Sequence, residues 1–144
     1  MMVEFREKVM IDASPARVWA VLAAIERWPN WTPTMSTVEC LEPGPPAIGM
    51  RVRITQPRLK PAVWEIDDWR QGQGFSWTTA SPGLKLRAEH TLTPRDGGCM
   101  VALRLCFDGI LARPVAWLAA RTTRRYLEQE ARGLKRHAES SAAI

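Results

Sequence analysis

The sequence predicts an α+β domain in which a curved, seven-stranded antiparallel sheet wraps around a long C-terminal helix. Residues 35–107 alternate between apolar and polar positions, and linkers rich in Gly and Pro interrupt the alternation. After Gly109 the alternation stops and Ala, Leu, Arg and Glu dominate, which favours a helix. Because 144 residues fit one domain, we expect a single domain over residues 1–139 and a disordered tail at residues 140–144.

The N-terminal segment predicts one strand followed by two short helices. Most odd positions of residues 3–11 are apolar and most even ones are charged, as in a half-buried strand. Ser14 and Pro15 suit the N-cap and the first position of a helix, which should run to about Glu26. The stretch ERWPNWTPT at residues 26–34 contains two prolines and should form a second, broken helical turn.

Six further strands are expected in the middle of the chain, and Asp96-Gly97 between the last two is a typical hairpin turn. The long helix should then cover about 28 residues between residues 110 and 139, with Pro114 in or near its first turn. The expected strands are residues 35–42, 48–55, 61–70, 74–80, 84–93 and 99–107.

The short turns predict which side chains share a face of the sheet, because a hairpin fixes the register of its two strands. Following the pairing from turn to turn collects apolar side chains on one face, and the long helix is the only element large enough to cover it. That face holds Met50, Val52, Ile54, Trp64, Ile66, Phe75, Trp77, Leu86, Ala88, His90, Leu92, Val101, Leu103, Leu105 and Phe107. The opposite face holds Arg51, Arg53, Lys85, Arg87, Glu89 and Arg104.

The long helix turns a stripe of mostly small residues toward that apolar face. Small residues opposite large ones leave space, and space lined by Trp, Phe and Leu is a pocket for an apolar molecule. The stripe consists of Ala116, Ala120, Thr123, Leu127, Ala131 and Leu134.

Composition argues against several other classes of protein. The N-terminus has no apolar core of the kind a signal peptide needs, and no apolar stretch approaches the ~20 residues of a membrane span, so we expect a cytoplasmic location without stable membrane insertion. Cys40, Cys99 and Cys106 show no metal-ligand spacing, and His90 and His137 lie far apart. We therefore expect no metal and no cofactor.

The charge is uneven, because residues 110–139 hold seven Lys or Arg against three Asp or Glu in a chain of net charge +5. This excess could contact phosphates or anionic lipid, or it could be the solvated face of an amphipathic helix. The aromatic residues fall on the covered face of the sheet, so we expect no nucleic acid partner. Transient membrane contact and the oligomeric state are left open.

Three stretches of the sequence carry a resemblance to a known family. The opening DASPARVWAVLAAIERWPNWTP, the hairpin SWTTASPGLKLRAEHTLTP and the final helix YLEQEARGLKRHAE resemble the START-like, or SRPBCC, superfamily and its bacterial polyketide cyclase/dehydrase-like branch. The resemblance covers about residues 2–138. It implies a helix-grip fold with a deep cavity between the sheet and the C-terminal helix, gated by the two short helices and neighbouring loops.

From the resemblance we expect a small hydrophobic ligand, lipid-like or polyketide-like and aromatic, to be bound or carried in that cavity. We expect Trp31 to close the cavity while Trp28 packs structurally; the alternative is that both rings are core residues. The residues expected to contact the ligand are Trp31, Trp64, Trp77, Leu86, His90, Leu103, Leu105, Leu127 and Leu134.

An enzyme would need acid and base groups on the apolar face of the sheet. Glu7, Asp68 and His90 are the candidates there, and Tyr126 could point toward the cavity or beside it. The three do not form a clear acid/base pair, so we expect binding rather than catalysis. A polyketide cyclase, aromatase or dehydratase acting in the same cavity is the alternative.

Overall fold

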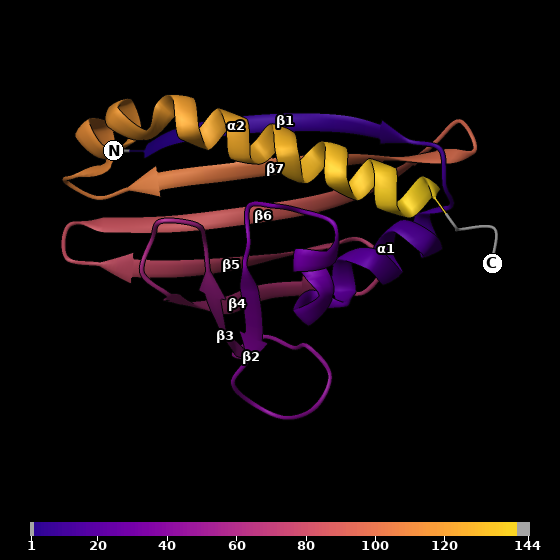
Figure 1. Ribbon diagram of the computed structural model, residues 1–144, viewed down its shortest axis with the longest axis horizontal. Helices are drawn as coiled ribbons and strands as arrows, with labels where there is room; N and C mark the ends of the chain where they lie inside the picture. Colours follow the sequence, from indigo (N-terminus) through magenta and orange to yellow (C-terminus); the bar gives the residue numbers. More distant parts are fainter. Residues whose placement is uncertain (1, 141–144) are drawn as a thin grey trace.

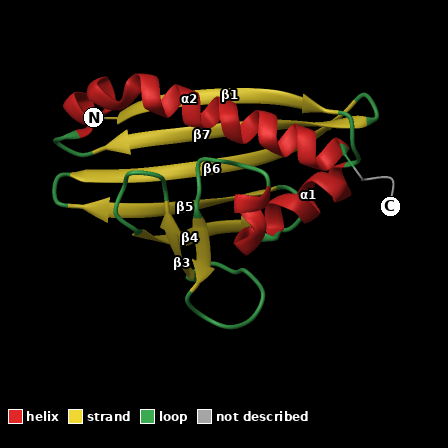
Figure 2. Cartoon of the chain, viewed as in Figure 1, coloured by secondary structure: helices red, strands yellow, loops and turns green. Residues whose placement is uncertain are grey.

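The computed structural model describes residues 2–140 and has the expected order of elements (Figures 1 and 2). One strand, an α-helix and a 3₁₀ turn precede six strands and a long helix. The elements are β1 (Met2–Ile11), α1 (Pro15–Ala23), η1 (Ile25–Asn30), β2 (Thr37–Cys40), β3 (Arg51–Thr55), β4 (Ala62–Arg70), β5 (Gly74–Ser81), β6 (Leu84–Arg95), β7 (Gly98–Asp108) and α2 (Ala112–Glu139).

The seven strands form one antiparallel sheet in the order β1-β7-β6-β5-β4-β3-β2. His90 lies opposite Leu103 on β7 and Phe75 on β5, as the strand pairing predicted from the short turns requires. Figure 1 shows α2 running across the sheet, with α1 beside its C-terminal end. The α+β helix-grip architecture predicted from the sequence is therefore confirmed.

The expected position of Asp68 is wrong, because β4 contains a bulge. Ile66 pairs with Trp77, but the next pair is Asp68 with Ser76, so the register shifts between them. The extra residue turns Asp68 to the outer face, where its Oδ2 accepts a hydrogen bond from Arg70 Nε at 3.1 Å. Strict alternation cannot reveal such an insertion.

Element boundaries differ by a few residues from those predicted. Ser14 caps α1 as expected, since its Oγ accepts a hydrogen bond from the Arg17 amide at 3.1 Å, but the helix ends at Ala23 rather than about Glu26. Strand β2 is four residues long, shorter than the predicted 35–42. Helix α2 has the predicted 28 residues. Of the predicted disordered tail, residues 141–144 lie outside the described residues.

Trp28 lies at the centre of the core. Its side chain is fully buried, and its indole N–H donates to the Leu22 carbonyl at 2.9 Å. Its ring packs edge-on against His90, and its centre lies 4.8 Å from the ring centre of Trp31 and 5.2 Å from that of Trp77. Trp28 therefore anchors the short turn η1 to the sheet.

Trp31 is a core residue as well, so the expectation that it closes the cavity is wrong. The ring is buried and tilted against Trp28, at 4.8 Å between ring centres. The Trp31 carbonyl oxygen approaches α2 so closely that a Cβ on Gly133 would clash with it. Gly133 thus permits the contact between η1 and α2, which compensates for its low helix propensity.

Candidate ligand cavity

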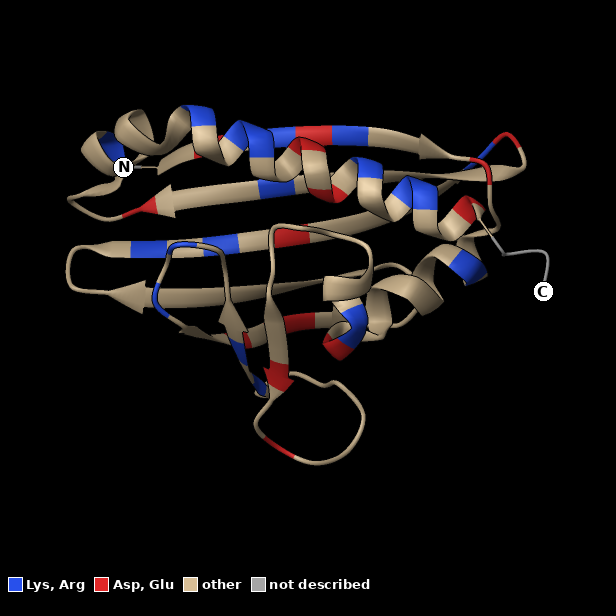
Figure 3. Ribbon diagram, in the orientation of Figure 1, with Lys and Arg blue, Asp and Glu red and all other residues tan. Residues whose placement is uncertain are grey.

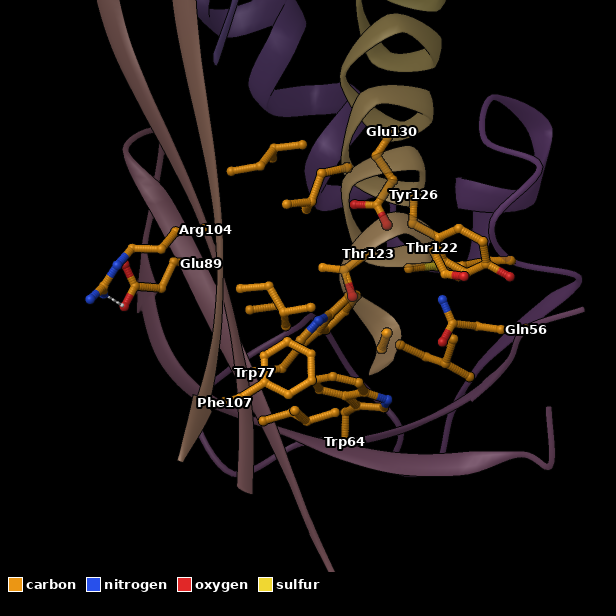
Figure 4. Close-up of a pocket in the computed structure, with 18 of the residues that line it drawn as sticks. Gln56, Trp64, Trp77, Glu89, Arg104, Phe107, Thr122, Thr123, Tyr126 and Glu130 are labelled. Atoms are coloured by element: carbon orange, nitrogen blue, oxygen red, sulfur yellow. Dashed lines mark hydrogen bonds and ion pairs between the residues drawn. The ribbon is translucent and has the colours of Figure 1, made fainter. Parts of the chain in front are cut away.

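A cavity of about 270 Å³ lies between the concave face of the sheet and α2 (Figure 4). The sheet contributes aromatic and aliphatic walls from β3 to β7, and α2 contributes the opposite wall. The sheet-side residues include Trp64, Trp77, Leu84, Leu86, Ala88, His90, Leu103, Leu105 and Phe107. The helix-side residues are Val115, Ala119, Thr122, Thr123, Tyr126, Leu127 and Glu130.

Most of the residues expected to contact a ligand line this cavity. They are Trp64, Trp77, Leu86, His90, Leu103, Leu105 and Leu127. Trp31 and Leu134 are buried in the core instead and are not among the described lining residues. Leu134 lies one helical turn beyond the cavity wall, close to the Trp31 contact.

The three candidate catalytic residues are not brought together. His90 lines the cavity, whereas Asp68 points to the outer face. Glu7 is half-buried on the same face as Phe5 and Val9, but it is not among the described residues that line the cavity. The tyrosine that could not be oriented from the sequence, Tyr126, does line it.

Glu130 gives the cavity a polar end. Its Oε2 accepts a hydrogen bond from Thr34 Oγ1 at 3.3 Å, and Thr34 Oγ1 is 2.9 Å from Thr32 Oγ1. Burial raises the pKa of the Glu130 carboxyl to about 7, although the bond from Thr34 opposes the shift. Figure 4 shows Glu130 and Tyr126 toward one end of the cavity and Trp64, Trp77 and Phe107 toward the other, with Gln56 at the side between the two groups.

His90 is buried among aromatic rings and is held neutral. Its ring stacks on Phe75 at 4.4 Å between centres, and desolvation lowers its pKa to about 4. Nδ1 lies 3.2 Å from the Phe75 carbonyl oxygen, which can only accept. The proton of the neutral ring therefore sits on Nδ1, and Nε2 is an acceptor.

Sequence reasoning missed Glu130, although a signal for it was present. Glu130 lies three residues after Leu127 and seven after Thr123, so it belongs to the same helical face as the small-residue stripe. Carboxyl groups are rarely buried, so one on the inward face of a helix indicates a candidate functional site. Gln56 and Leu59 were also missed, because they lie in a linker whose position no periodicity predicts.

The cavity opens between α2 and the loop that joins β3 to β4. Leu59 of this loop lines the cavity yet is 59% exposed, so it stands at the mouth. Val115, Ala119 and Thr122 form the opposite lip on α2. The mouth is therefore bounded on both sides by mostly apolar side chains.

The outer face of the sheet is polar and closes the cavity from behind. Glu89 and Arg104 border the cavity, but Figure 4 shows their side chains on the far side of the strands. There Arg104 donates to Glu89 at 2.8 Å and to Glu4 at 2.7 Å. Among residues 2–140, no three His, Cys, Asp or Glu side chains gather as they would around a metal ion.

Comparison with solved structures shows the same fold in several proteins. The chain superimposes on KanY with a TM-score of 0.76 at 22% identity, covering 97% of this chain and 99% of that one. A START superfamily protein from Mycobacterium smegmatis gives 0.74 at 17% identity, with 94% and 97% coverage. The di-domain ARO/CYC StfQ from the steffimycin biosynthetic pathway gives 0.73 at 14% identity, covering 100% of this chain and 53% of that one.

The family itself is identified from the sequence. A search of the curated proteins found no match. A family model described as polyketide cyclase / dehydrase and lipid transport matches residues 2–139. The chain therefore belongs to the polyketide cyclase / dehydrase and lipid transport family.

Proposed function

We propose that this protein binds one compact hydrophobic molecule that carries at least one oxygen able to form a hydrogen bond. The observation that supports this most is a cavity whose walls are mostly apolar and whose polar groups include the buried carboxyl of Glu130. Its volume of about 270 Å³ lies just below the usual range of small-molecule sites, roughly 300 to 1,000 Å³, which suits a compact ligand. The apolar body would lie against Trp64 and Trp77, with the oxygen toward Glu130.

Filling the cavity should abolish this binding. Ala88 faces the cavity from β6, between Trp77 and Leu105 on the neighbouring strands. An Ala88→Phe variant should bind a fluorescent naphthalene-type probe at least about tenfold more weakly, because a ring placed there occupies the space and overpacks what remains. Probe titration followed by fluorescence measures the dissociation constant.

The matched control is Ala102→Phe on β7, where the same substitution points to the outer face opposite Thr91. This variant should bind the probe as the wild type does. Equal weakening in both variants would mean that a general loss of structure, rather than a filled cavity, is responsible.

A cyclase or dehydratase function is the second candidate, and the position of Glu130 favours it. A carboxyl with a pKa near 7 is suited to general acid/base work at neutral pH. Ionised Glu130 would remove a proton from the methylene between two ketones of a bound chain. The carbanion would attack another ketone carbon of the same chain, and the resulting alkoxide would take the proton back from Glu130. For the dehydration, Glu130 would remove a second proton from the adjacent carbon as the carbon–hydroxyl bond breaks, and it would pass that proton to the departing hydroxide, which leaves as water.

A Glu130→Gln variant separates the two functions. If Glu130 is the base, turnover of a soluble polyketide analogue should fall on the order of 10²-fold or more while the analogue still binds, because the amide cannot accept the proton. Liquid chromatography of the product and a parallel binding titration measure the two quantities. Unchanged turnover would remove Glu130 from the mechanism.

A further inference from the structure

We propose that the N-terminal half of α2 is a docking surface for an anionic lipid bilayer. Among residues 2–140 the three most exposed large apolar side chains lie in or just before this segment. Trp117 and Leu118 are 79% and 75% exposed, and Ile110, two residues before the helix begins, is 88% exposed. A cluster of large apolar residues in water is unusual for a single domain and marks a surface that is covered in use. Tryptophan in particular favours the boundary between lipid headgroups and acyl chains.

The charge of the same segment complements anionic lipid. From Ala112 to Leu127 the sequence contains four arginines and no Asp or Glu. A shallow hollow on this face is lined by Arg121, Arg124 and Arg125 together with Trp117 and Leu118, and Glu128 is the one acidic residue at its edge. Figure 3 shows the positive residues along the first half of α2, with acidic residues appearing only further along the helix. Apolar side chains among arginines on one helical face are typical of helices that lie in the plane of a bilayer surface.

Two other partners fit this surface less well. Nucleic acid would suit the arginines, but Leu118 and Ile110 would find no apolar group on a phosphate backbone. A second copy of the chain would bring two sets of arginines together, which is unfavourable. None of the helices in the described part of the chain is long and apolar enough to cross a membrane, so the surface would rest on the bilayer.

The docking surface lies beside the mouth of the cavity. Leu118 lies three residues after Val115 and four before Thr122, so on the helix surface it is a neighbour of both lip residues. Exposed Leu59 stands at the opposite lip. A bilayer that contacts Leu118 would therefore meet the mouth, and an apolar ligand could pass between membrane and cavity with little exposure to water. The docking itself does not depend on the proposed cavity function.

Flotation with lipid vesicles tests the docking directly. Wild-type protein should float with vesicles of phosphatidylcholine and phosphatidylserine, but not with phosphatidylcholine alone, and the binding should weaken as salt is raised. A Trp117→Ser/Leu118→Ser double variant should lower the partition coefficient on the order of tenfold or more, since it removes most of the inserted apolar area. An Arg121→Gln/Arg125→Gln double variant should also lower it on the order of tenfold.

Each variant has a matched control elsewhere on the surface. Ile48→Ser removes an apolar residue that is 65% exposed in the loop between β2 and β3. An Arg27→Gln/Arg95→Gln double variant removes the same charge from exposed arginines outside α2. Both controls should float as the wild type does. All of these side chains are exposed, so the thermal midpoint should be unchanged in every variant.

Several outcomes would overturn the proposal. Equal flotation with neutral vesicles, or equal losses in the controls and the α2 variants, would show that this surface does not recognise anionic lipid. Concentration-dependent dimerisation that Trp117→Ser/Leu118→Ser abolishes would assign the surface to a second copy. Salt-sensitive binding to RNA without vesicle binding would assign it to nucleic acid. None of these outcomes would decide the proposed function of the cavity, which the probe titration tests separately.

Discussion

A Glu130→Gln variant should unfold with a free energy up to about 3 kcal/mol greater than the wild type above pH 7, and with nearly the same free energy below pH 4.5. The reason is that burial raises the pKa of this carboxyl from 4.5 to about 7. Between these two values the native state binds more protons than the unfolded state, so wild-type stability falls as pH rises through this range. The amide carries no charge and avoids the loss.

Chemical denaturation with urea at a series of pH values measures the difference. Because both proteins share every other titrating group, the difference in unfolding free energy reports Glu130 alone. Glu128→Gln is the control, since Glu128 is exposed on the same helix, and its difference from the wild type should be small at every pH. A Glu130→Gln difference that does not change with pH would contradict the burial of this carboxyl.

The same variant should reveal an opposite effect of His90. The pKa of His90 is lowered from 6.5 to about 4, so between these values the unfolded state binds more protons than the native state. Stability is therefore lost as pH falls from 6.5 to 4, by about 3 kcal/mol. In the wild type, protonation of Glu130 stabilises the native state over most of the same pH range and offsets this loss. In the Glu130→Gln variant the unfolding free energy should therefore fall more steeply between pH 6.5 and 4 than in the wild type.

Replacing each of the two central tryptophans by phenylalanine should give clearly different results. Trp28→Phe should cost about 2–4 kcal/mol of unfolding free energy, because it leaves a void in the core and removes the hydrogen bond to the buried Leu22 carbonyl. Trp31→Phe should cost at least about 1 kcal/mol less, because the buried Trp31 Nε1 has no hydrogen-bond partner among the described residues.

Thermal and urea unfolding of the two variants compare these costs. The pair is well matched, since the substitution is the same, both rings are buried, and the rings touch each other. Equal losses would show that ring volume alone decides the effect and that the bond from Trp28 to Leu22 contributes little.

The sequence was most informative where turns are short and alternation is unbroken. The Asp96-Gly97 hairpin and its neighbours predict the pairing of Phe75, His90 and Leu103 correctly. A short turn fixes which residues of its two strands lie opposite each other, and this pairing determines which side chains share a face of the sheet. The same reasoning fails at Asp68, because the bulge in β4 inserts an extra residue that the alternation of apolar and polar residues does not reveal.

The site was harder to predict than the fold, for physical reasons that differ between residues. Trp31 could not be placed from sequence, because its role depends on how closely η1 approaches Gly133 on α2, a contact between distant segments. Gln56 and Leu59 lie in an irregular loop without periodicity. Glu130, by contrast, shares the inward face of α2 with Thr123 and Leu127, and helical spacing would have identified it.

The most direct test of a ligand-holding cavity is to locate a bound probe by nuclear magnetic resonance. With methyl-labelled protein and a naphthalene-type probe, intermolecular nuclear Overhauser effects should connect the probe to Leu86, Leu103 and Leu105, which line the cavity. Val18 and Leu22, buried on α1 outside the described lining, should show none. Contacts confined to Trp117 and Leu118, or to the outer face of the sheet, would contradict the assignment of this cavity as the binding site.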